Sequence, residues 1–363
     1  MFRSILKYVP KKKILNSFIL YSASPAPKVY SSKIQKRDKK RTKKKQQQPT
    51  ETMARLWINC SDKREITNKY KLVSYNILAQ DLLVEHLHLY IQIEQAYLRW
   101  EHRSQKLGKE LLHINPDIIC LQEMQCNHVK NFVAQIGGQR CLEYVFKKKT
   151  GTRTDGCAII YDKSKFKLVQ HLGLEYYNSG HNLLNRENIA LIAKFDLKEE
   201  PGKSLIVATT HLLYNPKRED VRIAQVNVLL KALKQYSMKY ENSPIILTGD
   251  FNFERHMKPF EIISTAAQHP PLKNSACGDS NEKKGLELIP LDFNLGSECA
   301  STFQNKWITV DHIFYSKQTK GNHLEILEIC RLPTIKDCQM FGQIPNRFLG
   351  SDHYSLAFTF SVQ

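Results

Sequence analysis

The sequence lacks the features that mark membrane-anchored, disulfide-stabilised and zinc-finger proteins. None of its apolar runs approaches the length of a membrane span. Cysteine occurs nine times, an odd number, but there is no C-x-x-C and no cysteine pair stands at zinc-finger spacing from histidine. Cys120 and Cys157 lie inside apolar stretches, as buried thiols do. These absences favour a reduced, intracellular protein with no anchor and no structural zinc.

Acidic residues are absent from the first 37 positions. Residues 1–50 contain 15 Lys or Arg and a single acid, Asp38, so this segment carries +14 of the total charge of +19 and leaves +5 for residues 51–363. A basic, apolar, Ser-containing and acid-free start is typical of a mitochondrial transit peptide. The basic tract Lys33–Gln48 could instead be a nuclear import signal, an RNA-binding arm or a solvated linker.

We therefore expect residues 1–52 to form a basic targeting or disordered tail. A mitochondrial location is favoured, with the nucleus or cytoplasm as the alternative. Residues 53–363 show no linker-like break and no internal repeat, and an apolar content of 42% is ample for one substantial core.

The body alternates between strand-like and helical patterns, but incompletely. Eight segments rich in β-branched and aromatic residues predict strands at 71–76, 117–123, 156–162, 189–197, 204–212, 244–252, 310–316 and 354–362. Helical periodicity covers 93–113, which Pro116 ends, and 221–236, while 268–298 reads as a long loop. Incomplete alternation argues against a purely parallel sheet. It favours an α+β fold of two packed sheets with helices outside.

Polar residues recur where these strands end. In "PIILTGDFN" a buried strand finishes with Asp250 and Asn252, which share one side of an extended chain. Taken singly, each of these polar residues could have a structural role, in a turn, at a helix terminus or as a hydrogen-bonded histidine. Their recurrence after six separate apolar segments indicates a cluster, and such a cluster is a candidate metal-and-phosphate site. Its members are Asn76, Glu123, His211, Asp250, Asn252, Asp311, Asp352 and His353.

The motifs "SYN", "LQE", "GDFN" and "SDH", in this order, resemble the exonuclease–endonuclease–phosphatase superfamily that includes deoxyribonuclease I. "SYNILAQDLL", "DGCAIIYD" and "THLLYNPKREDVRIAQ" are similar to its nocturnin and carbon-catabolite-repression deadenylase branch, and within that branch to the angel group. The resemblance covers about Lys71 to Val362. It implies a four-layer αββα sandwich and Mg²⁺-dependent cleavage of phosphate esters, usually on RNA, with Mn²⁺ as a substitute metal.

The resemblance also implies roles for the clustered residues. Asp250 positions or deprotonates the attacking water, while Asn252 and His211 hold phosphate oxygens. His353, oriented by Asp311, donates to the phosphate. The resemblance assigns metal binding to Glu123, Asn76 and Asp352. It also assigns phosphate contacts to Arg186 and Asn188, and an adenine clamp to Trp307 and Pro216. Some relatives carry an acid where this chain has Leu78, which leaves the number of metal ions open.

Several functions fit these residues. The favoured one is removal of terminal 2′,3′-cyclic phosphates from RNA 3′ ends, as implied by the angel group. The alternative is 3′→5′ exonuclease activity on poly(A), and a sugar or lipid phosphatase is a further possibility. A non-catalytic RNA-bound adaptor is disfavoured, because the polar residues implied in catalysis are all present.

Overall fold

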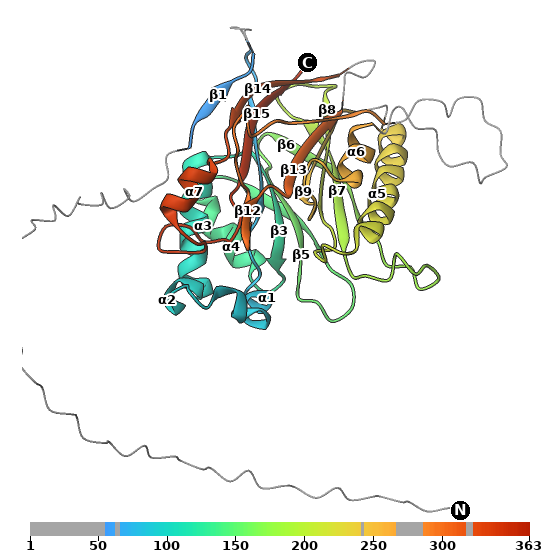
Figure 1. Cartoon of the computed structure of the whole chain (residues 1–363). Helices are drawn as coiled ribbons and strands as arrows, with labels where there is room; N and C mark the ends of the chain where they lie inside the picture. The colour runs from blue at the N-terminus through green and yellow to red at the C-terminus, as the bar shows by residue number, and fades with distance from the viewer. Residues whose placement is uncertain (1–54, 62–65, 241–242, 266–285, 317–321) are drawn as a thin grey trace, which may run out of the picture. The chain divides into compact units, whose positions relative to one another are not determined.

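The structure, a computed structural model, describes residues 55–61, 66–240, 243–265, 286–316 and 322–363. Two β-sheets pack face to face, and helices cover the outer face of each (Figure 1). The expected α+β sandwich of αββα layers is confirmed. The predicted tail, residues 1–52, lies outside the described residues. Among those described, no helix combines the length and apolar character needed to cross a bilayer.

The first sheet has seven strands, and its central strands are buried on both faces. Double burial explains why β2, β3 and β5 read as nearly uninterrupted apolar segments. In spatial order the strands are β1 (Trp57–Asn59), β14 (Leu324–Cys330), β15 (Leu356–Val362), β2 (Tyr70–Asn76), β3 (Ile118–Gln125), β5 (Asp155–Asp162) and β4 (Leu142–Lys148). Only β2 and β3 run parallel; the other neighbours in this sheet are antiparallel.

The second sheet has six strands and repeats this arrangement. Its spatial order is β10 (Leu288–Pro290), β13 (Asp311–Ser316), β9 (Ile245–Asp250), β8 (Ser204–His211), β7 (Ile189–Leu197) and β6 (Phe166–Glu175). The parallel pair here is β8 and β9, joined by a helical crossover as parallel neighbours require. A short hairpin, β11 (Thr302–Gln304) and β12 (Lys306–Ile308), stands apart from both sheets.

Helices cover the two outer faces with apolar stripes. On the first sheet, α3 (Trp100–Ile114) and α4 (Val129–Gly137) bury residues such as Leu107 and Phe132 against β2 and β3. On the second, α5 (Glu219–Lys239) and α6 (Lys258–Ser264) bury residues such as Leu229 and Ile263 against β8 and β9. The shorter helices are α1 (Gln80–Glu85), η1 (Leu87–Tyr90), α2 (Gln95–Leu98) and α7 (Ile335–Phe341).

The structure corrects two details of the predicted elements. The single helix expected over 93–113 is broken at Arg99, whose extended backbone (ψ 139°) separates α2 from α3. The loop expected over 268–298 contains β10, which pairs with β13. Residues 266–285 of that segment lie outside the described residues.

Candidate active site

Three of the expected residues lie side by side across the second sheet. The register pairs His211 at the end of β8 with Asp250 at the end of β9, and pairs Asp250 with Asp311 at the start of β13. Side chains at paired positions of neighbouring strands project from the same face. The backbone ladder therefore aligns an imidazole and two carboxylates in one row.

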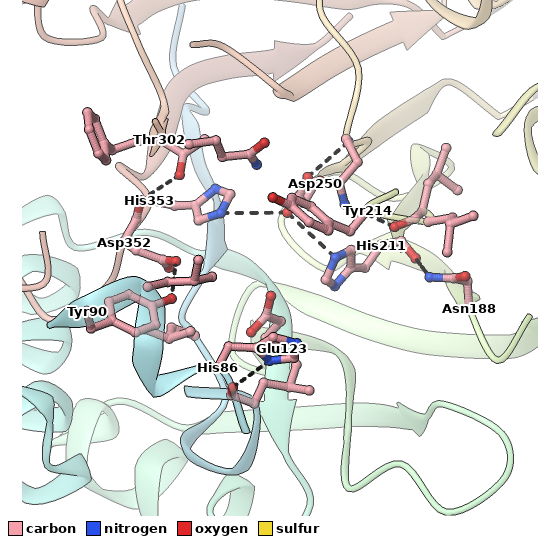
Figure 2. A pocket seen from close by; sticks show the side chains of 18 of the residues that line it. His86, Tyr90, Glu123, Asn188, His211, Tyr214, Asp250, Thr302, Asp352 and His353 are labelled. Carbon is pink, nitrogen blue, oxygen red and sulfur yellow. Dashed lines mark hydrogen bonds and ion pairs between the residues drawn. The ribbon is translucent and has the colours of Figure 1, made fainter. Parts of the chain in front are cut away.

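The first sheet adds two residues opposite this row. Asn76 ends β2, and its Nδ2 donates hydrogen bonds of 2.9 Å to Glu123 Oε1 and of 2.9 Å to Asp250 Oδ2. One amide thus joins a carboxylate of each sheet. Figure 2 shows Glu123 and Asp250 on opposite sides of the same pocket.

A local irregularity directs Glu123 into the site. The register between β3 and β5 shifts between Leu121 and Met124, and Glu123 has a φ of 56°, in the left-handed region. A non-glycine residue there costs on the order of 1–3 kcal/mol and persists only where its surroundings impose it. Here the backbone N–H of Ala79 donates to Glu123 Oε2 at 3.0 Å. The carboxylate is fixed by hydrogen bonds from Ala79 and Asn76.

His353 brings a positive charge to the row. Its Nδ1 lies 2.8 Å from Asp311 Oδ2, and its Nε2 lies 3.7 Å from Asp250 Oδ2. Burial opposes the charged imidazole, but the carboxylates of Asp311 and Asp250 outweigh it and raise the pKa of His353 well above its usual value. The ring is therefore a cation that points a proton toward Asp250 (Figure 2).

Asp250 titrates in an unusual range for a carboxylate. Burial and the neighbouring charge of Asp311 raise its pKa to about 7. A carboxylate with a pKa near neutrality is a better proton acceptor than an exposed one, and this is the property required of a general base. Its Oδ1 accepts the backbone N–H of Asn252 at 3.0 Å, so Oδ2 is the atom that faces both histidines.

His211 is held by two residues of the predicted set, Asp250 and Asn188, and by one residue that the sequence did not reveal. Its Nε2 lies 3.7 Å from Asp250 Oδ2, and its Nδ1 lies 3.4 Å from the ammonium of Lys149, a residue absent from the predicted set. Burial, Lys149 and His353 lower the pKa of His211 well below its usual value, so this ring is neutral. Asn188 donates to the carbonyl of His211 at 3.0 Å and acts as its support.

The remaining predicted residues divide between the cavity and its surroundings. Asp352 lines the cavity, and Tyr90 Oη donates to its Oδ2 at 2.8 Å. Asn252 also lines it, with Nδ2 donating to the carbonyl of Leu212 at 3.0 Å. Arg186 lies at the same cavity, half-buried.

The two residues of the expected adenine clamp, Trp307 and Pro216, do not line the cavity. Trp307 packs on the core with its ring 5.0 Å from Phe303 and 6.1 Å from Tyr354, and it does not line the cavity. Pro216 is exposed and also lies outside the lining. The aromatic side chains that do line the cavity are Tyr90, Tyr214 and Phe303.

The cavity has a volume of about 380 Å³, near the lower end of the range for small-molecule sites. Its polar side carries the two histidines and the carboxylates (Figure 2). Its apolar side is formed by Leu82, Leu89 and Ile93 from the segment between β2 and α3. The arrangement suits a small ligand with a charged end and an apolar body.

The donor set fits a hard divalent cation. Glu123, His211 and Asp250 offer ligand atoms within 4.8 Å of one another. Asp250, Asp311 and His353 lie equally close, but the protonated His353 leaves only the two carboxylates of that group as donors. Burial and the nearby charge of Asp352 raise the pKa of Glu123, so a cation among these carboxylates would relieve their mutual repulsion. Oxygen-rich sites of this kind suit Mg²⁺. Leu78 packs with Leu83 and Tyr90 and adds no ligand.

Comparison with known proteins shows the family and the fold of the chain. The model of the Endonuclease/Exonuclease/phosphatase family matches residues 73–353. The chain is 42% identical to Protein angel of Drosophila melanogaster over 375 residues, which cover the whole of both chains. It is 38% identical to Protein angel homolog 1 of Homo sapiens over 192 residues, covering 51% of this chain and 29% of that longer protein.

Two solved structures share the fold. One is the crystal structure of ANGEL2, a 2′,3′-cyclic phosphatase, in complex with adenosine-2′,3′-vanadate. Its sequence is 27% identical to this chain, the TM-score is 0.71, and the match covers 85% of this chain and 99% of that one. The human nocturnin catalytic domain, at 24% identity and a TM-score of 0.61, covers 85% and 98% and shows the fold alone. The chain therefore belongs to the endonuclease/exonuclease/phosphatase family and is a phosphoester hydrolase of this family, whose enzymes generally depend on a divalent metal.

Proposed function

We propose that this protein is a Mg²⁺-dependent phosphoesterase that hydrolyses terminal 2′,3′-cyclic phosphates at RNA 3′ ends. The main observation behind the proposal is that Asp250, a carboxylate with a pKa of about 7, lies between one neutral and one cationic histidine. The similarity to ANGEL2, a 2′,3′-cyclic phosphatase, supports this substrate.

Different side chains accept the proton, donate the proton and bind the phosphate. Asp250 accepts a proton from water as the water oxygen attacks phosphorus, and one of the two ring P–O bonds breaks. His353, kept cationic by Asp311, donates its Nε2 proton toward the oxygen that leaves. His211 and Asn252 donate to the phosphate oxygens that are not displaced. The product is a ribose phosphomonoester.

The metal would be held by Glu123, Asn76 and Asp352. A bound Mg²⁺ supplies positive charge that stabilises the negative charge developing on the phosphate. Asn76 would offer its Oδ1, which in this structure accepts the backbone N–H of Leu78 at 3.0 Å, because its Nδ2 is engaged with Glu123 and Asp250. Asp352 would offer Oδ1, which accepts only a long hydrogen bond of 3.4 Å from the Ser351 hydroxyl, whereas Oδ2 accepts the Tyr90 hydroxyl at 2.8 Å.

We expect a terminal cyclic phosphate to be a better substrate than poly(A), because the protein should bind a long single strand of RNA weakly. Exonucleases must align an internal bond, and stacking on aromatic side chains contributes about 1–3 kcal/mol per base. This proposal is supported by the absence of Trp307 and Pro216 from the residues that line the cavity. Residues 51–363 also carry only +5 net charge for binding a phosphate backbone.

Gel analysis of two matched RNA oligonucleotides tests the proposal. The full chain with Mg²⁺ should convert an oligo(A) ending in a 2′,3′-cyclic phosphate faster than it shortens the same oligo(A) ending in a 3′-hydroxyl. Asp250→Asn keeps the shape of the side chain but cannot accept the proton, so this variant should catalyse neither reaction. A ladder of shortened RNA with the cyclic end untouched would establish the deadenylase instead.

We further propose that the acid-free N-terminus directs the protein to mitochondria, since its composition is that of a transit peptide. A reporter fused to residues 1–37 should enter mitochondria. A reporter that stays in the cytosol or collects in the nucleus would contradict this proposal, and the tract Lys33–Gln48 would then be tested as an import signal with a fusion of its own.

A further inference from the structure

Lys149 is a buried cation beside the active site that the mechanism above does not use. It follows β4 directly, and its side chain is 10% exposed. The ammonium Nζ lies 2.7 Å from Oδ2 of Asp155, at the start of β5, and 3.4 Å from Nδ1 of His211. Asp155 is itself 1% exposed. Lysine is rarely buried to this extent unless it is paired, and here Asp155 is the pair.

The chemistry of this contact determines where the proton of His211 sits. An ammonium has three N–H donors and no acceptor, so at the shared contact Nδ1 of His211 must accept. A neutral imidazole that accepts at Nδ1 carries its proton on Nε2. That atom lines the cavity side of the ring, 3.7 Å from Oδ2 of Asp250. The charge on Lys149 is secured by Asp155 and by Glu123, which together outweigh burial and raise its pKa.

We propose that Lys149, held by Asp155, is a positioning residue that fixes His211 as the neutral tautomer with its proton on Nε2. The catalytic consequence rests on the proposed phosphoesterase function: His211 donates an N–H to a phosphate oxygen and does not act as a base. The tautomer itself is independent of that function. A protonated Nε2 has no lone pair for a cation, so His211 is excluded as a metal ligand, although Glu123, His211 and Asp250 are close enough to form a three-ligand set.

Nitrogen NMR of the full chain, labelled with ¹⁵N-histidine, tests the tautomer directly. His211→Gln identifies the signals of His211 among those of the 13 histidines. We expect a protonated Nε2 and an unprotonated Nδ1 in the absence of metal, and the same pattern after Mg²⁺ is added. A proton on Nδ1, a doubly protonated ring, or loss of the Nε2 proton on adding Mg²⁺ would overturn the proposal.

Kinetics show whether Lys149 acts through His211. Lys149→Met alone would leave the buried charge of Asp155 uncompensated and endanger the fold. The comparison is therefore between the unmodified protein and the double variant Lys149→Met/Asp155→Asn, which removes both buried charges together. With adenosine 2′,3′-cyclic phosphate as the probe, the double variant should lower kcat roughly tenfold or more, with KM changed less than about threefold.

Repeating the comparison in a His211→Gln background separates positioning from direct contact with substrate. Residues that act as one unit are not additive, so removal of the lysine should then lower kcat by less than about twofold. An equal loss in both backgrounds would show that Lys149 acts on the substrate without His211, and the proposal would fail. If the unmodified enzyme leaves the probe intact, the proposed function fails, while the NMR measurement still decides the tautomer.

Discussion

A hydrogen bond of 2.8 Å between imidazole Nδ1 and carboxylate Oδ2 joins His353, in the segment that leads into the first sheet, to Asp311 of the second sheet. Asp311 begins β13 of the second sheet, and His353 lies three residues before β15 of the first. The charge of the imidazole therefore depends on the packing of one sheet against the other. A backbone bridge between His353 and Thr302, the first residue of β11, also holds the segment that carries His353.

Replacing Asp311 by Asn should reduce kcat by about a hundredfold, the lower end of the range for acid–base residues. The amide keeps a hydrogen-bond acceptor but removes the negative charge that raises the pKa of His353. Because His353 acts in its protonated form, activity should then be lost at lower pH than in the unmodified enzyme. The pH profile of kcat measures this, and an alkaline limb that does not move would contradict the role of Asp311.

Replacing Glu123 by Gln should abolish turnover in Mg²⁺ while leaving the fold nearly unchanged, because the amide can retain part of the hydrogen bonding to Asn76 and Ala79. A ligand that binds only the folded state adds about 2.7 kcal/mol of stability at 100 times its Kd. Saturating Mg²⁺ should therefore raise the melting temperature of the unmodified protein but not of Glu123→Gln. Glu143→Gln, an exposed glutamate paired with Lys163, is the matched control and should keep both properties. Full activity in Glu123→Gln would remove this residue from the metal set.

Replacing Arg222 by Met should destabilise the protein by roughly 3 kcal/mol or more. Its buried guanidinium donates to the carbonyls of Leu213, Asn215 and Pro216, and a buried polar group that loses its partner costs about 1–3 kcal/mol. Chemical denaturation measures the loss. Arg218→Ala, which breaks only an exposed pair with Asp220, should change the midpoint little. Equal effects of the two variants would contradict this account.

Stability should fall as the pH is lowered from about 6.5 to about 4, partly because of His312. Burial lowers the pKa of this histidine to about 4, and its Nε2 lies 2.8 Å from the carbonyl of Phe253. Between these pH values the unfolded chain binds a proton that the folded chain does not, so acid favours unfolding. The contribution is on the order of 3 kcal/mol. Denaturation of the unmodified protein and His312→Gln across this range should show their stabilities converging toward acid. A constant difference would exclude His312 as the cause.

Burial pattern determined which strands could be predicted from the sequence. β7, Ile189–Leu197, is covered on both faces and was predicted with its observed bounds. β6, Phe166–Glu175, pairs with β7 at the edge of the sheet, and most of its residues are exposed, so lysine, glutamine and histidine interrupt its apolar pattern. The strand-end residues were predictable because a polar side chain after a buried run is unusual there.

Neighbouring residues of one type show what the sequence could not predict. Lys147 pairs with Glu175, Lys148 donates to backbone carbonyls including that of Gly151, and Lys149 is buried beside His211. Lys147 and Lys148 end β4 and Lys149 begins the turn toward β5, so three consecutive lysines have three different environments. Phe303 and Trp307 pair across the β11–β12 hairpin, yet only Phe303 lines the cavity. The sequence alone does not show which of these two aromatic residues lines the cavity.

The row of His211, Asp250 and Asp311 is spaced by the hydrogen-bonding pitch of the sheet, about 4.8 Å between neighbouring strands. The residues that line the rest of the cavity, including Arg186, Tyr214 and Phe303, come from connecting segments and a small hairpin. Reactivity and substrate choice are therefore encoded in separable parts of the chain. Exchange of the connecting segments with those of another enzyme of this fold should redirect the protein to a different phosphate ester while the reacting groups keep their positions, because loops tolerate replacement better than the strands they join.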